Sequence, residues 1–351
     1  MDISNQLQQQ VRDANANREP VSIIGGNSKS FYGRKRKANP LLVGEHRGVV
    51  NYEPSELVLT ARCGTRLSEI EAMLGEAGQM LPFEPPQFTG SATIGGTVAS
   101  GLSGPGRVYW GAARDYVLGV QSVNGKGEVL RFGGEVVKNV AGFDASRLMV
   151  GAMGTLGVLL EISLKVLPKP DVDKTLRFQL SQQEAIRQLN QWSGKPLPVT
   201  ASAYTDNQLY IRLSGTKSGV DAAIPSLGGG EIVDSHQFWS AIRDQTHPFF
   251  RNDDPLWRVS VPPATAELPV EGEWLIEWGG AQRWLKTSLE EGHVRDCVKK
   301  AGGYATRFRG HDSSETIFHP LPPALHSVHQ HLKCAFDPCR VLNPGIMYAD
   351  L

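Results

Sequence analysis

Two glycine-rich segments constrain the fold of this 351-residue chain more than any other feature of its sequence. The first, residues 24–30 (IGGNSKS), ends a run rich in β-branched residues, which predicts a short strand at Val21–Ile24 and a tight turn after it. Glycines let backbone N–H groups approach an anion, and the Asn, Ser and Lys side chains add donors and a positive charge. The segment therefore indicates a turn that binds pyrophosphate, although Gly-Gly-Asn-Ser after a strand is often only a turn. It has neither the spacing of a nucleotide P-loop nor that of the dinucleotide fingerprint.

The second segment, residues 91–104 (SATIGGTVASGLSG), follows a Pro85-Pro86 pair and precedes Arg114 and Asp115. Its small residues would let the backbone pack flat against a planar ligand and its phosphates, whereas a core segment would carry bulkier side chains. Together the two segments predict a cofactor site.

Hydrophobic periodicity predicts mixed helices and strands, and hence an α+β fold. Residues 65–78 have helical spacing, with Thr65 as N-cap and Gly78 as the residue after the C-cap. Residues 124–127 (NGKG) predict a hairpin turn between strands at 116–123 and 128–132. A strand at 155–167 ends in Pro-Lys-Pro, the best domain boundary, and a second set of strands and helices follows, including a helix near 286–301.

Charge and composition name no partner by themselves. Lys plus Arg and Asp plus Glu both number 36, so no net field favours nucleic acid or an anionic membrane. The single dense basic run, residues 34–37, could bind nucleic acid, but a solvated loop that adds positive potential near the pyrophosphate is the more ordinary interpretation. The N-terminus is polar and no run approaches the roughly 20 apolar residues of a membrane span. We therefore expect a cytoplasmic protein with no nucleic acid partner and no direct membrane insertion.

The four cysteines predict no metal site. Cys63, Cys297, Cys334 and Cys339 form no C-x-x-C pair, so neither a zinc ion nor an iron–sulfur cluster would find its usual ligands. If electrons leave this protein for an iron–sulfur centre, that centre is expected on another chain.

Taken together with residues 138–144 (KNVAGFD) and 151–158 (GAMGTLGV), these motifs resemble the FAD-binding domain of the vanillyl-alcohol-oxidase/p-cresol-methylhydroxylase (PCMH) type. The match runs in order from about residue 20 to residue 168 and resumes at 337–338 (DP) and 343–345 (NPG). Within that family, the whole chain is similar to the smaller flavin-type subunit of bacterial glycolate oxidases.

The resemblance implies a two-subdomain FAD-binding domain at residues 1–168, a smaller α+β cap or partner domain at 171–315, and a C-terminal segment at 316–351 that returns to the first domain. The first loop would hold the pyrophosphate, the second would line the ribityl chain and the isoalloxazine, and β-strand backbone near residue 161 would meet the adenine. The implied cofactor-binding residues are Gly25, Gly26, Asn27, Ser28, Lys29, Ser30, Pro85, Ser91, Thr93, Ile94, Gly95, Gly96, Ser100, Gly101, Gly104, Arg114, Asp115, Gly157, Glu161 and Ile162. Because these loops contain no His or Cys, the FAD is expected to be non-covalent.

The implied activity is FAD-dependent oxidation of a 2-hydroxy acid, glycolate to glyoxylate, inside a complex. The implied partners are a homologous flavoprotein subunit and an iron–sulfur subunit that receives the electrons, with any membrane association peripheral, on the inner membrane and through the complex. Two alternatives stay open: a free-standing flavin-dependent 2-hydroxy-acid dehydrogenase, and a scaffold subunit that keeps the fold without a redox role.

The sequence assigns no catalytic residue. Such a reaction needs a base for the hydroxyl proton and a cation, usually Arg, for the carboxylate. Relatives that oxidise D-2-hydroxy acids unaided carry a G-H-G-H-x-G-D-G-N-type motif, and residues 171–351 contain none. The histidines at 326, 329 and 331 lack the spacing of a metal site. Arg258, Arg283 and Arg307 adjoin aromatic stretches and could hold a carboxylate, but surface or ion-pair roles are the more ordinary explanation.

Overall fold

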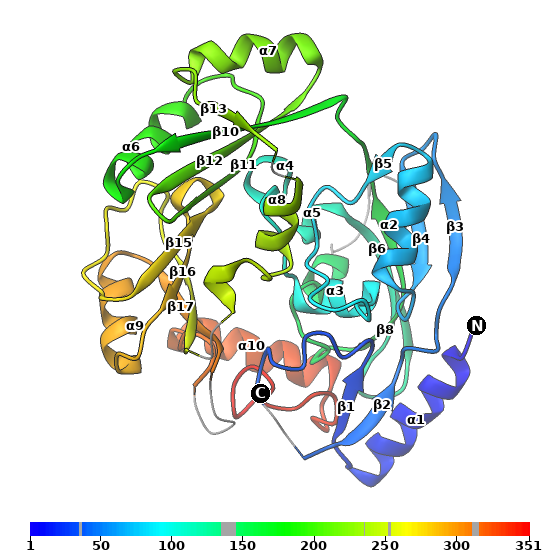
Figure 1. Ribbon diagram of the computed structural model, residues 1–351. Helices are drawn as coiled ribbons and strands as arrows, with labels where there is room; N and C mark the ends of the chain where they lie inside the picture. Colours follow the sequence, from blue (N-terminus) through cyan, green and yellow to red (C-terminus); the bar gives the residue numbers. More distant parts are fainter. Residues whose placement is uncertain (35–36, 135–144, 235, 252–253, 311–315) are drawn as a thin grey trace.

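Two antiparallel β-sheets, one of five strands and one of eight, form the frame of the molecule (Figure 1). The computed structural model describes residues 1–34, 37–134, 145–234, 236–251, 254–310 and 316–351. The five-stranded sheet comes from the N-terminal half and the eight-stranded sheet from the C-terminal half, with helix α8 (His236–Arg243) between them in Figure 1.

The N-terminal half combines the five-stranded sheet, in the order β3-β4-β8-β6-β7, with a parallel pair β1-β2 and a short pair β5-β9. Its strands are β1 (Val21–Ile24), β2 (Asn39–Leu42), β3 (Val49–Glu53), β4 (Val58–Arg62), β5 (Gln79–Met80), β6 (Val117–Val123), β7 (Val129–Gly133), β8 (Val158–Lys165) and β9 (Leu167–Pro168). Its helices are α1 (Ser4–Asn17), α2 (Leu67–Glu76), α3 (Ile94–Ser100), α4 (Arg107–Trp110), α5 (Ala113–Tyr116) and the 3₁₀ turn η1 (Ala145–Met149). One apolar cluster joins α1, α2 and α3 to the sheet, and its members include Leu7, Ile70 and Ile162, none of which is exposed.

The C-terminal half is built on the sheet β13-β10-β12-β11-β15-β16-β14-β17. Its strands are β10 (Val172–Gln179), β11 (Val199–Thr205), β12 (Gln208–Gly215), β13 (Glu231–Val233), β14 (Leu256–Ser260), β15 (Glu273–Glu277), β16 (Gln282–Lys286) and β17 (Tyr304–Arg309). Its other elements are α6 (Gln182–Ser193), α7 (Lys217–Ser226), η2 (Pro248–Phe250), η3 (Trp278–Gly280), α9 (Glu291–Lys300) and α10 (Pro323–Phe336), besides α8.

Side chains of this sheet alternate between an outer and an inner face. On β14, Trp257 and Val259 pack in an apolar cluster with Val294 and Val298 of α9 on the outer face. Leu256 belongs instead to a cluster that includes Tyr32 and Met153 of the N-terminal half. The inner face of the eight-stranded sheet therefore packs against the N-terminal half.

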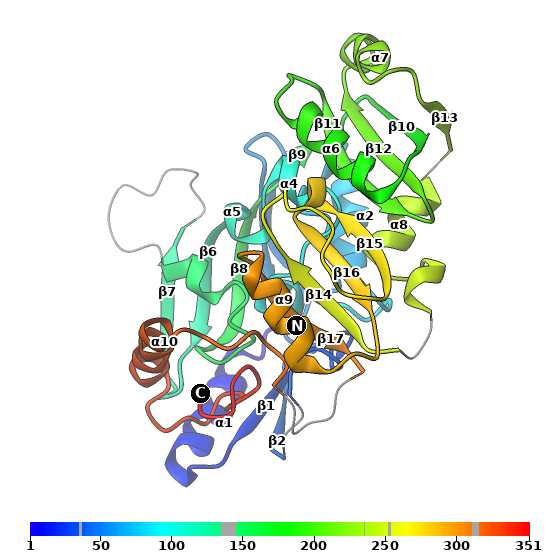
Figure 2. The same cartoon turned by 90° about the vertical axis from the view of Figure 1, so that its left-hand side faces the viewer.

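The last helix, α10, returns to the N-terminal half and lies beside β7 (Figure 2). The Phe336 ring lies 6.1 Å from the ring of Phe132, and the chain after α10 forms an isolated parallel bridge between Leu342 and Val21. The boundaries at residues 168, 171 and 315 stay predictions, and residue 315 lies outside the described residues.

Most elements expected from periodicity are present, including the hairpin of β6 and β7 and strand β1. The expected cap of α2 is wrong: the N-cap is Arg66, because the Thr65 hydroxyl donates to the Arg62 carbonyl and accepts from the Gly48 N–H. Gly78 follows the C-cap with φ +66°, as predicted. The helix expected at residues 286–301 begins only at Glu291, because Lys286 is the last residue of strand β16.

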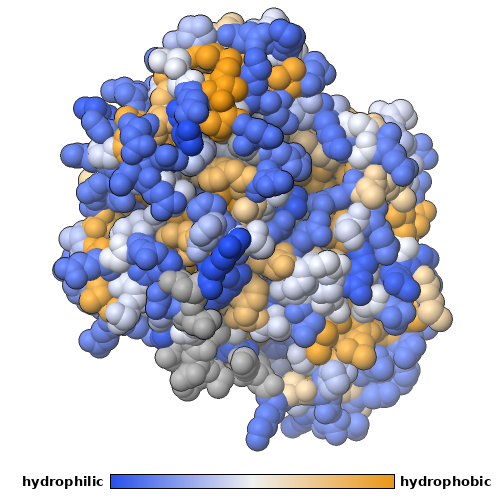
Figure 3. Space-filling view, viewed as in Figure 1, coloured by the Kyte–Doolittle hydropathy of each residue, from blue (hydrophilic) through white to orange (hydrophobic). Residues whose placement is uncertain are grey.

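Polar side chains cover most of the face shown in Figure 3. An apolar area lies over β13, the edge strand, whose Ile232 is 55% exposed. Among the described residues, no helix combines the length and the apolar character needed to cross a bilayer.

A buried ion pair fixes the returning segment. Lys333 is 2% exposed and Asp337 is fully buried, and their Nζ and Oδ2 atoms lie 2.7 Å apart. The ammonium also donates to the carbonyls of Thr155 and Leu342, and the carboxylate accepts the Leu342 N–H.

Replacing Asp337 with Ala would remove the buried carboxylate that pairs with the Lys333 ammonium and accepts the Val341 and Leu342 N–H groups, so we expect the free energy of unfolding to fall by about 3–5 kcal/mol. Chemical denaturation measures it. Asp350→Ala removes a half-exposed carboxylate that pairs with His326 and should cost less than about 1 kcal/mol. Equal losses in the two variants would contradict this account of the buried pair.

Candidate functional site

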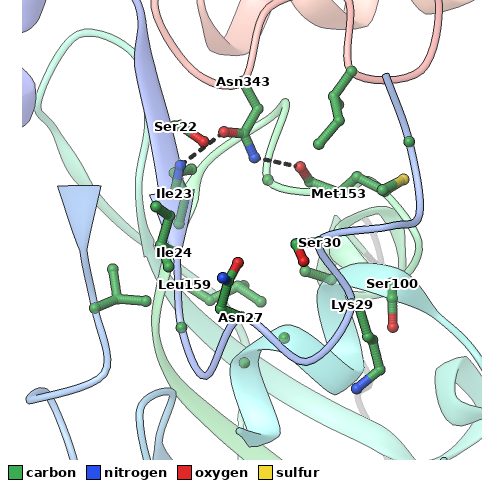
Figure 4. Close-up of a pocket in the computed structure, with 18 of the residues that line it drawn as sticks. Ser22, Ile23, Ile24, Asn27, Lys29, Ser30, Ser100, Met153, Leu159 and Asn343 are labelled. Carbon is green, nitrogen blue, oxygen red and sulfur yellow. Dashed lines mark hydrogen bonds between the residues drawn. The ribbon is translucent and has the colours of Figure 1, made fainter. Parts of the chain in front are cut away.

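A cavity of about 430 Å³ lies where the loop after β1 faces helix α3 (Figure 4). Four parts of the chain line it: the first glycine-rich segment, α3 with its N-cap, the segment from Met153 into β8, and the C-terminal segment after α10. The lining residues include Ser22, Ile24, Gly25, Gly26, Asn27, Ser28, Lys29, Ser30, Tyr32, Cys63, Thr93, Gly95, Gly96, Ser100, Met153, Gly157, Leu159, Asn343 and Ile346. A volume of this size is typical of sites that hold small molecules and cofactors.

The two glycine-rich segments touch through their backbones. A Cβ at Gly26 would lie 1.5 Å from the carbonyl oxygen of Ser91, and one at Gly25 would lie 2.6 Å from the Thr93 hydroxyl oxygen. The Ser91 hydroxyl donates to the Gly26 carbonyl at 2.6 Å. Only glycine allows this approach, so both positions serve to hold the first loop on the second.

The first loop carries unused donors. Within the part of the chain that the structure describes, the backbone N–H groups of residues 26–29 donate to no protein group. Asn27 has φ +57°, a left-handed conformation that Asn tolerates and that turns successive N–H groups toward one concave side. All of these residues line the cavity. The loop therefore fits an anion such as a phosphate.

Lys29 adds positive charge beside the loop. Its side chain runs from the loop toward Phe88, and Nζ lies 5.5 Å from the centre of that ring. Burial lowers the pKa of the Lys29 ammonium to about 8, although the charge of Asp244 opposes the shift. A poorly solvated ammonium of this kind gains from a bound anion.

Helix α3 contributes a wall rather than free donors. Its Ile94 N–H donates to the Thr65 carbonyl at 3.0 Å and its Gly95 N–H to the Cys63 carbonyl at 2.8 Å. The Gly96 N–H is taken by the Thr93 hydroxyl, 3.3 Å away. A Cβ at Gly95 would lie 2.6 Å from the Cβ of Cys63, so this glycine lets the helix pack closely on the turn before α2.

Several predicted site residues support the cavity from outside its lining. Ser91 holds the first loop, and Ile94, the first residue of α3, is fully buried. Gly101 ends α3 in a left-handed conformation, where a Cβ would lie 3.0 Å from Gly151. Pro85 is buried in the loop before the second segment. Their direct contact with a cofactor stays a prediction.

The remaining predicted residues lie farther away. Gly104 contacts the C-terminal half, where its carbonyl accepts the Trp278 indole N–H at 3.0 Å. Arg114 and Asp115 are exposed on α5. Glu161 and Ile162 lie within β8, where they pair with residues of β4 and β6, while Gly157 and Leu159 line the cavity. The motif at residues 138–144 lies outside the described residues.

Asn343 is a site residue that was not predicted. Its Oδ1 accepts the Ile23 N–H at 2.8 Å and its Nδ2 donates to the Met153 carbonyl at 2.7 Å (Figure 4). The side chain therefore joins three separate parts of the cavity wall. The NPG motif at 343–345 was the signal in the sequence.

Two of the residues weighed for other chemistry, His326 and Arg283, make structural contacts. His326 lies 3.0 Å from an Asp350 carboxylate oxygen, and the Arg283 guanidinium donates to the carbonyls of Gly280 and Ala266. Burial lowers the pKa of Arg283 to about 10. Within the described residues, no group of three or more His, Cys, Asp or Glu side chains is arranged to hold a metal ion.

Comparison with known proteins agrees with this geometry. The family model described as an FAD binding domain matches residues 3–133. The solved structure of p-cresol methylhydroxylase with substrate bound aligns with a TM-score of 0.73 at 14% identity, over 100% of this chain and 88% of the other. Alkyldihydroxyacetonephosphate synthase aligns with a TM-score of 0.69 at 15% identity, over 97% and 75%. The matched domain and the fold define a protein that has an FAD-binding domain and the fold of p-cresol methylhydroxylase.

Two curated proteins narrow this class. The glycolate oxidase subunit GlcE of Escherichia coli (strain K12) is 50% identical over 350 residues, 100% of this chain and 99% of that protein. The glycolate oxidase subunit GlcD of Bacillus subtilis (strain 168) is 34% identical over 136 residues, 39% of this chain and 29% of that protein. The chain belongs to the family of the glycolate oxidase subunit GlcE. The predicted family, the α+β fold class, the FAD cofactor and the class of FAD-dependent oxidoreductase are thereby confirmed.

Gly26→Ala should disrupt the contact between the two loops, because the new Cβ would meet backbone that cannot rotate away. We expect the dissociation constant for FAD to rise at least tenfold, about 1.4 kcal/mol. Flavin fluorescence titration measures it. Gly90→Ala is the matched control, since a Cβ there meets nothing within 4 Å, and its affinity should equal that of the unchanged protein. Equal affinities in all three proteins would refute the proposed role of the contact.

Proposed function

We propose that this chain is the FAD-binding subunit of a complex that oxidises glycolate to glyoxylate. The observation that carries the proposal is the 50% identity to the Escherichia coli glycolate oxidase subunit GlcE along the whole chain. The cavity supports it, because unused N–H donors and a buried ammonium suit the phosphates of FAD.

Bound FAD would supply the redox chemistry, accepting the two electrons and the hydrogen that leave C2 of the acid. The chain's own residues do the binding. Residues 25–30 would hold the pyrophosphate, residues 93–104 with Pro85 would lie along the ribityl chain and isoalloxazine, and the β8 backbone near Glu161 would meet the adenine. The eight-stranded sheet, packed on the same half, would exclude water from the flavin ring.

The FAD is proposed to be non-covalent. Cys63 lines the cavity, but burial raises the pKa of its thiol to about 12. A thiol with so high a pKa is almost entirely protonated near neutrality and is a poor nucleophile. A covalent bond to the flavin through this residue is therefore not expected.

The proposed partners are a homologous flavoprotein subunit and an iron–sulfur subunit that receives the electrons. The similarity to the glycolate oxidase subunit GlcD of Bacillus subtilis supports the first, because that name belongs to a second, similar type of subunit in the same kind of enzyme. We further propose that residues 1–168, 171–315 and 316–351 are the FAD-binding domain, the cap domain and a returning segment, and that any contact with the inner membrane is made through the complex.

The experiment is an absorbance spectrum of the purified chain after FAD is added and the excess removed, followed by acid precipitation. We expect yellow protein that releases all its flavin into the supernatant. Co-expression with the two partner subunits should give a complex that forms glyoxylate from glycolate. Colourless protein would favour the scaffold alternative, and glyoxylate formation by the chain alone would favour the free-standing dehydrogenase.

A further inference from the structure

A row of polar side chains lies on the inner face of the eight-stranded sheet, where the sheet packs on the N-terminal half. Glu277 ends β15, Gln282 begins β16 opposite it, and Arg258 lies on the neighbouring strand β14. Glu277 is 4% exposed and Gln282 is 3% exposed. Burying such groups costs stability unless they are hydrogen-bonded, so the row calls for a functional explanation.

Hydrogen bonds fix one oxygen of Glu277 and leave the other unused. Oε2 accepts the Trp284 indole N–H at 2.6 Å and the Gln282 amide at 3.0 Å. The Gln282 carbonyl oxygen in turn accepts the Arg258 Nε–H at 2.7 Å. In the described part of the chain, Oε1 has no hydrogen-bond partner.

A small cavity adjoins this carboxyl group. Its volume is about 20 Å³, enough for one water molecule. Glu277, Gln282 and Arg258 line it on the sheet side, and Phe88 with residues 102–104 lines it on the side of the N-terminal half. A water held there could bond to the unused oxygen of Glu277.

The small cavity and the larger one share a wall. One apolar cluster contains Tyr32 and Met153, which line the large cavity, together with Leu102, Trp284 and others that line the small one. Ser100, at the end of α3, lines the large cavity two residues before Leu102. Glu277 therefore lies behind the wall of the site assigned to FAD.

The charged groups around Glu277 come from several elements. Arg258 on β14 and Arg243 on α8 line the same small cavity, and Glu84 of the N-terminal half pairs with Arg212 of β12 at 2.7 Å. Burial raises the pKa of Glu277 to about 7, against the hydrogen bonds from Trp284 and Gln282 and the charge of Arg258, while Glu84 adds to the rise. Near neutral pH the group can therefore gain or lose a proton.

We propose that Glu277, with one water in the small cavity, is a redox-linked proton site that takes up a proton when the bound FAD is reduced and releases it when the electrons leave. Oxidation of a 2-hydroxy acid to the keto acid yields two electrons and two protons. The electrons and one proton go to FAD, and the second proton converts the Glu277 carboxylate to the carboxylic acid. When the iron–sulfur partner accepts the electrons, both protons return to solvent.

The inference rests on the proposed function, because it needs FAD in the large cavity. Its physical cause is electrostatic: negative charge gained by the flavin makes the nearby carboxylate harder to keep ionised, since the surroundings are poorly solvated. The reciprocal effect follows by linkage, so an ionised Glu277 lowers the reduction potential of the flavin.

The test is spectroelectrochemistry of the FAD-loaded full chain from pH 5 to pH 9, in the unchanged protein and in Glu277→Gln. Below about pH 6 the Glu277 carboxyl is protonated and resembles the amide, so the two reduction potentials should coincide. Above pH 8 the variant should be more positive, because the unchanged protein carries the extra negative charge. Between the pKa of Glu277 with oxidised FAD and its higher pKa with reduced FAD, the difference between the two potentials should grow by about 30 mV for each tenfold fall in proton activity, the value for one proton per two electrons.

Glu273→Gln is the matched control. Glu273 lies on the same strand but is 68% exposed and pairs with Lys286, so its variant should follow the unchanged protein at every pH. Potentials of Glu277→Gln that run parallel to those of the unchanged protein over the whole range would overturn the proposal. Failure to bind FAD in the unchanged protein would instead defeat the proposed function.

A second measurement needs no variant. Infrared difference spectra of protein labelled with ¹³C-glutamate, recorded at pH 8, should show the carbonyl band of a protonated carboxylic acid appearing when the FAD is reduced. If Glu277→Gln does not fold, the absence of that band in the unchanged protein is sufficient to reject the proposal.

Discussion

The close contact between the backbones of Gly26 and Ser91 is the constraint on which the cofactor cavity depends. It brings the loop after β1 onto the segment before α3, two parts of the chain that are 65 residues apart. The contact fixes the path of the first loop, and its N–H groups at residues 26–29 stay free of protein partners in the described structure. A side chain at Gly26 would separate the loops, so the free donors and the glycine have the same structural origin.

The eight-stranded sheet makes the second contribution. Its outer face is apolar under α9, and its inner face combines apolar side chains with the row of Arg258, Gln282 and Glu277. Polar groups buried between two halves cost stability unless all of their polar atoms are hydrogen-bonded, and in the described structure one oxygen of Glu277 is not. Their position behind the wall of the cavity proposed for FAD suits the proposed role of Glu277 in controlling charge near the flavin, which a purely apolar interface could not provide.

The parts of the fold that could be predicted are those that depend on local sequence signals, such as turn residues. The hairpin at residues 124–127 and strand β1 were predicted because their turn residues act on their own neighbours in the chain. Helix α1 was missed because only Leu7, Val11 and Ala14 of its mostly polar sequence are buried. Strand β16 was mistaken for helix at its end because it contains charged residues, whose burial is permitted only by partners elsewhere in the fold.

The sequence indicates the parts of the candidate site that depend on backbone, and not those that depend on distant side chains. The glycine-rich loops can be recognised from their composition. In contrast, Asn343 is hydrogen-bonded to Ile23, which lies 320 residues away in the chain. Glu277 acquires its environment only when the two halves pack together. Neither hydrophobic periodicity nor the spacing of residues in the sequence predicts such contacts. The ordered set of motifs supplied what the local pattern could not, the family to which the chain belongs.

Amide hydrogen exchange with and without FAD tests the central claim most directly, because it reports on the backbone N–H groups that the account assigns to the phosphates. A peptide covering residues 25–31 should become protected when FAD binds and should stay unprotected with riboflavin, which has no phosphate. Unchanged exchange in that peptide at saturating FAD, with protection elsewhere, would contradict it.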